Sequence, residues 1–172
     1  YNPEFLTGSV TGTGDIVRYR IFPSEINAPV LDTSQKYLGE LSVFHMPGEG
    51  EAVHSQFVKC DGRTLNLTGD EDNPALFSVL KDALGYDSNA TEFRLPDYTA
   101  RSVAAGFDYY MTRRGTKADM RGTQDAIIKD GLAYIPVKLS DYKVDYANAV
   151  CYGEIVLLKG TDKALRKSGY IP

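Results

Sequence analysis

Two aspartates are the residues of this sequence that could do acid–base chemistry as a pair. Asp61 precedes Gly62, and Asp97 follows Pro96. Glycoside hydrolysis uses two carboxyl groups, one as the proton donor and one as the base or nucleophile. Aspartate before glycine and aspartate after proline are also ordinary turn residues. Because turn formation already explains both positions, we predict no catalytic residues and no enzyme activity, and a polysaccharide hydrolase is the weakest alternative.

The sequence favours neither a metal site nor a cofactor site. His45 and His54 have no cysteine or third ligand at a recognisable interval, which argues against zinc. The acidic run 69–73 lacks the central glycine and distal glutamate of a calcium loop. Cys60 lies on an apolar strand face, so we expect an inert core thiol; whether it pairs with Cys151 is open. We therefore predict no cofactor and no bound metal.

One aromatic and basic segment has the composition of a contact surface. Residues 107–114 contain Tyr109, Tyr110, Arg113 and Arg114 in what the sequence indicates is a loop. Tyrosine and arginine are frequent anchors of interfaces, and tyrosine rings also stack on sugars. We expect these four residues to contact a neighbouring subunit, with a receptor as the alternative.

Composition limits the class of protein to which the chain can belong. Its 172 residues, 42% hydrophobic and 24% charged, are enough for one ordinary domain or two small ones. The net charge of −4, without a long basic block, argues against nucleic acid as a main partner. The apolar runs are far shorter than the about 20 residues that span a membrane. The first residues lack the pattern of a signal peptide, and whether the N-terminus is processed is open.

Alternating apolar and polar residues predict several strands. From Asp15 to Phe22 the apolar residues alternate with Arg18 and Arg20, as in a strand with one face toward water. Asp61-Gly62 separates two apolar runs, which predicts a tight hairpin turn. Residues 46–53 are expected to form a loop. Further strands are expected at 40–44, 93–95, 135–139, 142–146 and 150–158, the last with a bulge at Gly153.

One helix is predicted near Pro74 to Leu84. Asn73 suits the N-cap, Pro74 suits the first helical position, and Gly85 can end the helix in a left-handed conformation. An apolar stripe at helical spacing indicates the buried face, and it consists of Leu76, Phe77, Leu80 and Leu84. The sequence therefore predicts a mainly β (α+β) protein with one short helix near 74–84.

The order of these motifs resembles the phage tail collar domain family. That family has an aromatic residue, a Cys-Asp-Gly turn, a short Leu-Phe helix, a Gly-Tyr step and a Phe-x-Leu-Pro-Asp strand that leads into a basic segment. The resemblance covers roughly 39–106. The residues that carry it are Phe57, Cys60, Asp61, Gly62, Leu76, Phe77, Gly85, Leu95, Pro96, Asp97 and Arg101.

This sequence departs from the family pattern at three places. Phe57 stands where the family usually has tryptophan, and Thr99-Ala100 replaces a usual Arg-Gly before Arg101. Many relatives continue into a region with a His-x-His pair, and some trimeric short tail fibres bind metal there. Neither histidine of this chain belongs to such a pair. The resemblance therefore implies a collar-like unit without that metal-binding region.

The resemblance also implies a division of the chain and a role. Residues 1–38 would be an N-terminal arm and strand that makes assembly contacts, and 39–106 a tail-collar-like domain. Residues 107–172 would be a β-rich region that is either separate or completes the same domain. The implied role is a structural virion protein of the tail, fibre or collar region that acts in assembly.

The expected partners are other virion proteins and further copies of the chain. The resemblance implies a homotrimer, because collar-like domains of phage fibres are similar to threefold knobs on trimeric shafts. Short strands with a single helix also leave sheet edges that neighbouring copies can cover. A monomer whose terminal strands cover these edges is the alternative. The alternative role is host attachment, as a receptor-binding fibre tip that recognises the bacterial surface.

Overall fold

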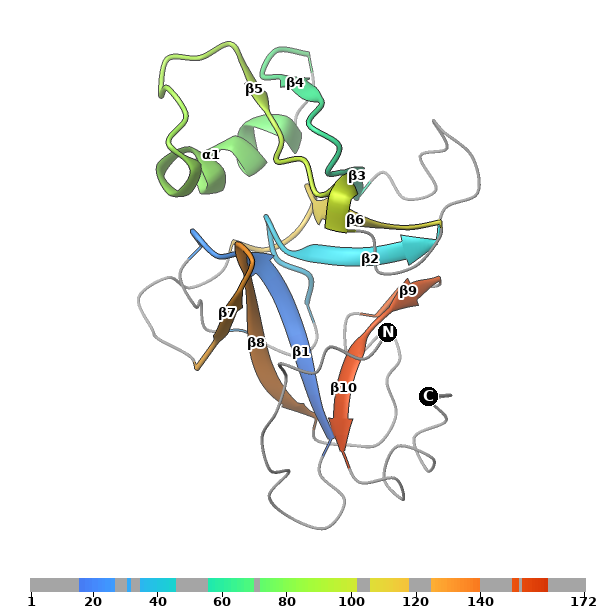
Figure 1. Cartoon of the computed structure of the whole chain (residues 1–172). Coiled ribbons are helices and arrows are strands. Elements are labelled where there is room, and N and C mark those ends of the chain that lie inside the picture. The colour runs from blue at the N-terminus through green and yellow to red at the C-terminus, as the bar shows by residue number, and fades with distance from the viewer. Residues whose placement is uncertain are drawn as a thin grey trace.

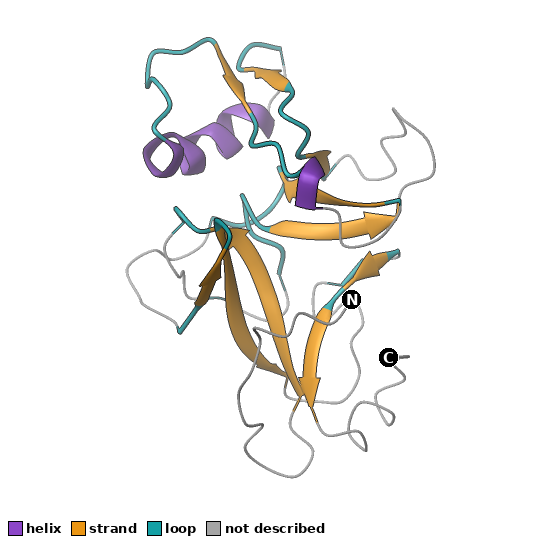
Figure 2. Ribbon diagram, in the orientation of Figure 1, coloured by secondary structure: helices purple, strands orange, loops and turns teal. Residues whose placement is uncertain are grey.

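The fold is mainly β, as predicted, with a short α-helix (Figure 2). A computed structural model describes residues 16–26, 31, 35–45, 56–69, 72–101, 106–117, 125–139, 150–151 and 153–160. Within these ranges α1 is the single α-helix. The elements in chain order are β1 (Ile16–Pro23), β2 (Leu41–His45), β3 (Phe57–Lys59), β4 (Thr64–Asn66), α1 (Asp72–Leu84), β5 (Glu92–Arg94), the 3₁₀ turn η1 (Thr99–Arg101), β6 (Phe107–Thr112), β7 (Ile127–Lys129), β8 (Leu132–Leu139), β9 (Glu154–Ile155) and β10 (Leu157–Gly160).

Most strands belong to one large antiparallel sheet with the order β3–β6–β2–β1–β8–β7. β1 pairs with β8 along its whole length, from Ile16↔Leu139 to Pro23↔Leu132. β6 lies between β3 and β2, so strands from before residue 39 and after residue 106 share this sheet with strands of the collar-like segment. The predicted strands at 15–22, 40–44 and 135–139 are confirmed as β1, β2 and part of β8.

The strands β1 and β2 diverge from each other, and the C-terminal strands fill the space between them. Ile21↔Leu41 is the one register pair that joins β1 to β2 in the described residues. β10 then pairs with β1 over residues 16–19, while β9 pairs with β2 at residues 43–44. We call the divergence of β1 and β2 the fork, and residues 154–160, drawn in red in Figure 1, the strap.

The helix and a small second sheet lie together at one end of the large sheet, beyond β3 and β6 (Figure 1). β4 pairs with β5 in this second sheet. Leu76 and Leu80 of α1 are fully buried, and they belong to the same apolar cluster as Phe93 of β5, Ile21 of β1 and Met111 of β6. One continuous core therefore connects the helical end to the large sheet.

The ends of α1 were predicted with mixed success. Gly85 has a φ of 73°, and the amide of Tyr86 donates to the carbonyl of Lys81 at 2.9 Å, which confirms the left-handed cap. The N-cap prediction for Asn73 is wrong, because α1 already includes Asp72. The buried Asn73 side chain instead donates from Nδ2 to the carbonyl of Asn66 at 2.9 Å, which ties the start of the helix to β4.

The hairpin predicted at Asp61-Gly62 is wrong. β3 before it pairs with β6, and β4 after it pairs with β5, so the dipeptide connects strands that do not pair with each other. Gly62 has a φ of 78°, so the dipeptide forms a local turn of the chain. The hairpin with this dipeptide lies elsewhere: Asp130 and Gly131 both have positive φ and join β7 to β8.

Three further predictions on local structure are wrong. The face of β1 that carries Arg18 and Arg20 is not wet, because these residues are only 3% and 1% exposed. The segment predicted as a loop at 107–114 begins with six residues of strand β6. Gly153 has a φ of 77° and lies in the turn before β9 rather than in a bulge.

Some expectations fall outside the described residues. These are the arm at 1–14, the loop at 46–53, the position of His54 and the strand at 142–146. Of the helices that the structure describes, none has the length and hydropathy needed to span a membrane.

Candidate functional site

The residues of the collar motif meet where the chain leaves β3 and where it leaves β5. Asp61 and Asp97 form an antiparallel bridge. The amide of Tyr98 donates to the carbonyl of Cys60 at 2.8 Å, and the amide of Leu95 donates to the carbonyl of Arg63 at 2.9 Å. Two parts of the motif that are about thirty residues apart in sequence are thus joined by backbone hydrogen bonds.

The carboxylate of Asp61 is held by a residue of its own turn. Oδ1 accepts from the amide of Arg63 at 3.1 Å and from its Nε at 2.9 Å, and Oδ2 accepts from its Nη2 at 2.8 Å. These hydrogen bonds to Arg63 are the main reason why the pKa of Asp61 lies below its usual value. A catalytic acid requires the opposite shift, toward neutral pH.

The carboxylate of Asp97 is held in a similar way, by Thr99. Its Oδ1 accepts from the amide of Thr99 at 3.0 Å and from the hydroxyl at 2.6 Å, and these bonds lower the pKa of Asp97. The spacing of Asp97 and Arg101 would allow an ion pair, but none joins them among the described residues. The Arg101 guanidinium lies over the ring of Tyr98, 5.5 Å from its centroid. Both aspartates therefore serve their own turns, and neither has the raised pKa that a catalytic acid needs.

An aromatic cluster joins the motif helix to the motif strand. The ring of Phe77 lies 6.1 Å from that of Tyr86 and 5.3 Å from that of Phe93, between centroids. The Tyr86 hydroxyl donates to the carbonyl of Arg94 at 2.5 Å. Burial, with a smaller contribution from Cys60, raises the pKa of Tyr86 to about 12. Phe77 and its neighbours thus act in packing.

The remaining apolar motif residues also lie in the interior. Leu76, Leu95 and Cys60 are at most 2% exposed, and the ring of Phe57 packs 4.9 Å from that of Phe44. The thiols of Cys60 and Cys151 are both free, which answers the question of their pairing. Burial raises the pKa of Cys60 far above its usual value, as expected for an inert core thiol.

Of the residues predicted as a contact surface, the two tyrosines lie on opposite faces of β6, and the two arginines follow the end of this strand. Tyr109 is 3% exposed and packs on Tyr98, so it belongs to the core. Tyr110 is half-buried against Phe44, at 5.7 Å between centroids. Arg114 is exposed and donates from Nε to Asp72 in the first turn of α1 at 2.6 Å. Arg113 is half-buried.

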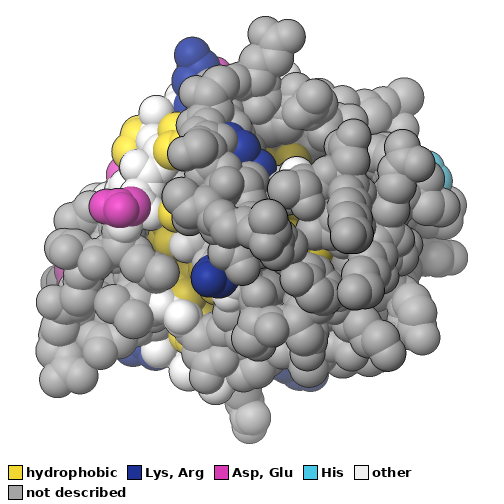
Figure 3. Space-filling model, turned by 90° about the horizontal axis from the view of Figure 1, so that it is seen from below, with side chains coloured by type: hydrophobic (Ala, Val, Ile, Leu, Met, Phe, Trp, Pro, Cys, Tyr) yellow, Lys and Arg dark blue, Asp and Glu magenta, His cyan; other side chains and the backbone are white. Residues whose placement is uncertain are grey.

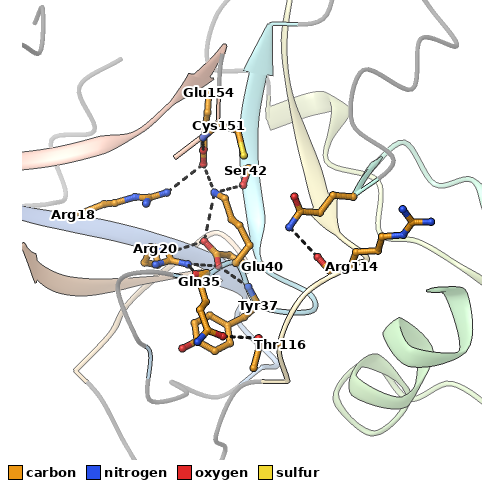
Figure 4. A network of polar contacts seen from close by, with 12 residues as sticks. Arg18, Arg20, Gln35, Tyr37, Glu40, Ser42, Arg114, Thr116, Cys151 and Glu154 are labelled. Carbon is orange, nitrogen blue, oxygen red and sulfur yellow. Dashed lines mark hydrogen bonds and ion pairs between the residues drawn. The ribbon is translucent and has the colours of Figure 1, made fainter. Parts of the chain in front are cut away.

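The sequence did not reveal a cluster of buried charges at the fork (Figure 4). Five side chains form this cluster, which we call the ion cluster. They are Arg18 and Arg20 of β1, Glu154 of β9, and Lys36 and Glu40 from the segment before β2. Nε and Nη2 of Arg20 donate to Oε2 and Oε1 of Glu40, each at 2.6 Å. Oε1 of Glu154 accepts from Lys36 Nζ at 2.5 Å and from Arg18 Nη2 at 3.3 Å. A small cavity adjoins four of these residues, Arg18, Arg20, Glu40 and Glu154.

The ion cluster connects parts of the chain that are distant in sequence. Arg18 and Glu154 are 136 residues apart, and all five side chains are at most 4% exposed. Buried charges are tolerated only when they are paired and hydrogen-bonded, so this arrangement requires all its members to be in place. The sequence signal was the pair of arginines alternating with apolar residues, which is equally typical of a solvated strand face.

The described residues do not form a metal site of the usual composition. Among the described residues, no three His, Cys, Asp or Glu side chains group together as metal ligands would. On the face seen in Figure 3, the Lys and Arg side chains that are drawn in colour lie at separate places.

Comparison with known proteins agrees with the motif. No curated protein and no solved structure matches the chain. Residues 45–103, about a third of the chain, match the model of the phage tail collar domain family, and this range contains β3, β4, α1, β5 and η1. That family is a structural domain of phage tails and not an enzyme family. Residues 45–103 are thus similar to a phage tail collar domain, and this similarity indicates a structural protein of the virion tail.

Proposed function

We propose that the chain acts in assembly of the tail, as a subunit whose collar domain packs against other virion proteins. The observation that carries this proposal is that the motif residues serve the structure of the domain itself. In the described part of the chain, the two motif aspartates hold turns, and most of the apolar motif residues build the core. Such a unit offers a fixed shape to its neighbours rather than a reactive group.

We further propose that the collar segment does not act alone. β1 and β8 continue the sheet that β2, β3 and β6 begin, and the apolar cluster runs through both parts. Residues 39–106 and the segments on either side of them would then dock on the virion as one body.

The proposed assembly is a homotrimer. The large sheet ends at β3 on one side and at β7 on the other. On β7 the side chain of Ile128 is 58% exposed, the largest exposure of a large hydrophobic residue in the described chain. Uncovered strand edges favour pairing with another chain, and a head-to-tail contact that closes under rotation forms a ring. Sedimentation analysis of the purified chain would give the trimer mass, whereas a monomer at every concentration would count against it.

The assembly role is tested by removing the protein from the particle. Phage that lack this chain should give tails that are visibly incomplete in electron micrographs, and the wild-type chain supplied separately should restore them. A receptor-binding tip predicts a different result: complete tails that fail to adsorb to host cells. Tyr110, Arg113 and Arg114 are the remaining candidate contacts for that alternative role, because part of each is exposed.

The hydrolase alternative is tested with two matched variants. Asp61→Asn and Asp97→Asn each remove one carboxylate and keep the shape of the side chain. Under the assembly role neither variant changes the rate at which host polysaccharide is degraded, because the wild-type rate is already zero. Degradation by the wild-type chain that both folded variants lack would contradict the proposal.

A further inference from the structure

The strap is held at the fork mainly by strand edges and by one charge. It pairs with β1 through four register pairs, from Ile16↔Gly160 to Tyr19↔Leu157, and with β2 through Val43↔Ile155 and Phe44↔Glu154. Leu157 is its one fully buried apolar side chain, at 5% exposed. The strap therefore contributes much to edge pairing and little to the core.

The charge of Glu154 completes the ion cluster. Its carboxylate accepts from Arg18, from Lys36 and from the amide of Cys151, and its side chain is 3% exposed. Without it, the fork would hold the cations Arg18, Arg20 and Lys36 of the cluster against the single carboxylate of Glu40. The fork thus fits a β-strand that brings a carboxylate to the position opposite Phe44.

We propose that the fork is a strand-acceptor site, and that in the assembled tail it takes the strap of a second copy in place of the chain's own. This inference rests on the proposed assembly role. A second copy carries the same strand, with the same register and the same carboxylate, so every contact of the fork is reproduced between chains. Exchange of an identical element is a low-cost route to oligomers for this reason. It also keeps the edges of β1 and β2 covered in both arrangements.

Disulfide trapping across the fork tests the exchange. Val17 lies between Lys159 of β10 and Lys138 of β8 in the register of the sheet. The trap is Val17→Cys with Lys159→Cys, and the matched control is Val17→Cys with Lys138→Cys, both in a Cys151→Ser background. Both pairs use the same cysteine on β1 and replace a lysine on a neighbouring strand.

The two pairs give different products if the strap is exchanged. After oxidation at high protein concentration, the trap should give covalently linked oligomers on a non-reducing gel, and the control should give only linked monomers. Linkage of the trap within single chains at every concentration would overturn the proposal. That result would leave the tail assignment untouched, because the assignment depends on whether the chain is in the particle.

Hydrogen exchange of the full wild-type chain gives a second test, which holds even if no disulfide forms. In dilute, monomeric protein the amides of β10 should exchange through a local opening at lower free energy than those of β8. The substitution Glu154→Gln should speed exchange in β10 by at least about tenfold, because it removes charge-assisted hydrogen bonds, and leave β6 unchanged. Equal protection of β10 and β8 in the wild-type monomer would show that the strap is not displaceable.

Discussion

Arg20 and Glu40 form a two-point ion pair in the interior of the protein, with both side chains 1% exposed. The pair lies beside Ile21↔Leu41, the register pair from which β1 and β2 diverge. Oε1 of Glu40 also accepts from the amide of Tyr37 at 3.1 Å. This pair therefore fixes the base of the fork that the strap closes.

The substitution Glu40→Gln should be strongly destabilising. It leaves Arg20 and Lys36 buried with too little negative charge, and breaking a buried pair in this way costs about 3–5 kcal/mol. The free energy of unfolding, measured by urea titration, should fall by that amount. The matched control Asp72→Asn breaks the more exposed pair with Arg114 and should cost at most about 1 kcal/mol. Equal losses in the two variants would contradict the structural role of the ion cluster.

Stability should decrease in acid, and Glu40 should account for part of the decrease. Burial raises the pKa of Glu40, but attraction to Arg20 and Lys36 and the hydrogen bonds to Arg20 outweigh it, so the net pKa is lowered. A lowered folded-state pKa means that the unfolded chain binds the proton more tightly. The contribution of Glu40 is therefore complete above the unfolded value of about 4.3 and is lost as the pH falls through the folded pKa. Urea midpoints below about pH 4.3 should fall less steeply in Glu40→Gln than in the wild type, and parallel slopes would contradict this assignment.

Gly39 should tolerate alanine less well than Gly69. Both have positive φ, 84° and 83°, so alanine costs about 1–2 kcal/mol of backbone strain at each. A Cβ at Gly39 would lie 2.8 Å from Cδ1 of the buried Ile26, whereas at Gly69 it would meet nothing within 4 Å. Overpacking should add about 1–3 kcal/mol at Gly39 alone. Thermal unfolding of both variants measures the difference, and the same melting temperature for both would show that the contact with Ile26 is absent.

The two thiols should react at different rates. Cys60 is 1% exposed and burial strongly raises its pKa, while Cys151 is half-buried with a pKa that burial raises less. Labelling of the native chain with a thiol reagent should modify Cys151 first and Cys60 only on the timescale of unfolding. In denaturant both should react together. Rapid native labelling of Cys60 would contradict its place in the core.

The sequence predicted those elements whose signals are local. The helix could be found because the proline in its first turn, the apolar stripe and Gly85 all agree, and β1 could be found from its alternation. The dipeptide Asp-Gly occurs at two places with different structural roles. Asp130-Gly131 joins two strands that pair with each other, whereas Asp61-Gly62 joins two strands that do not. A turn dipeptide fixes the direction of the backbone, whereas the partner of each strand depends on residues far along the chain.

The ion cluster could not be predicted for the same reason. Arginines that alternate with apolar residues on β1 are typical of a solvated face, and only the fold brings Glu154 to Arg18. The prediction of a loop at 107–114 was wrong for a similar reason. Asp108 on β6 pairs with Lys59 of β3, and Tyr110 on β6 packs on Phe44 of β2. The collar motif was found from residue types and order, and its residues do converge, although the bridge between Asp61 and Asp97 required the structure.

The central claim is that this chain is a structural protein of a phage tail, and its location on the particle tests this most directly. Intact virions should be imaged by electron microscopy after labelling with a gold-tagged antibody raised against the purified chain. The label should lie on the tail, at a position repeated from particle to particle. Purified virions without label, or with label confined to the head, would contradict the claim.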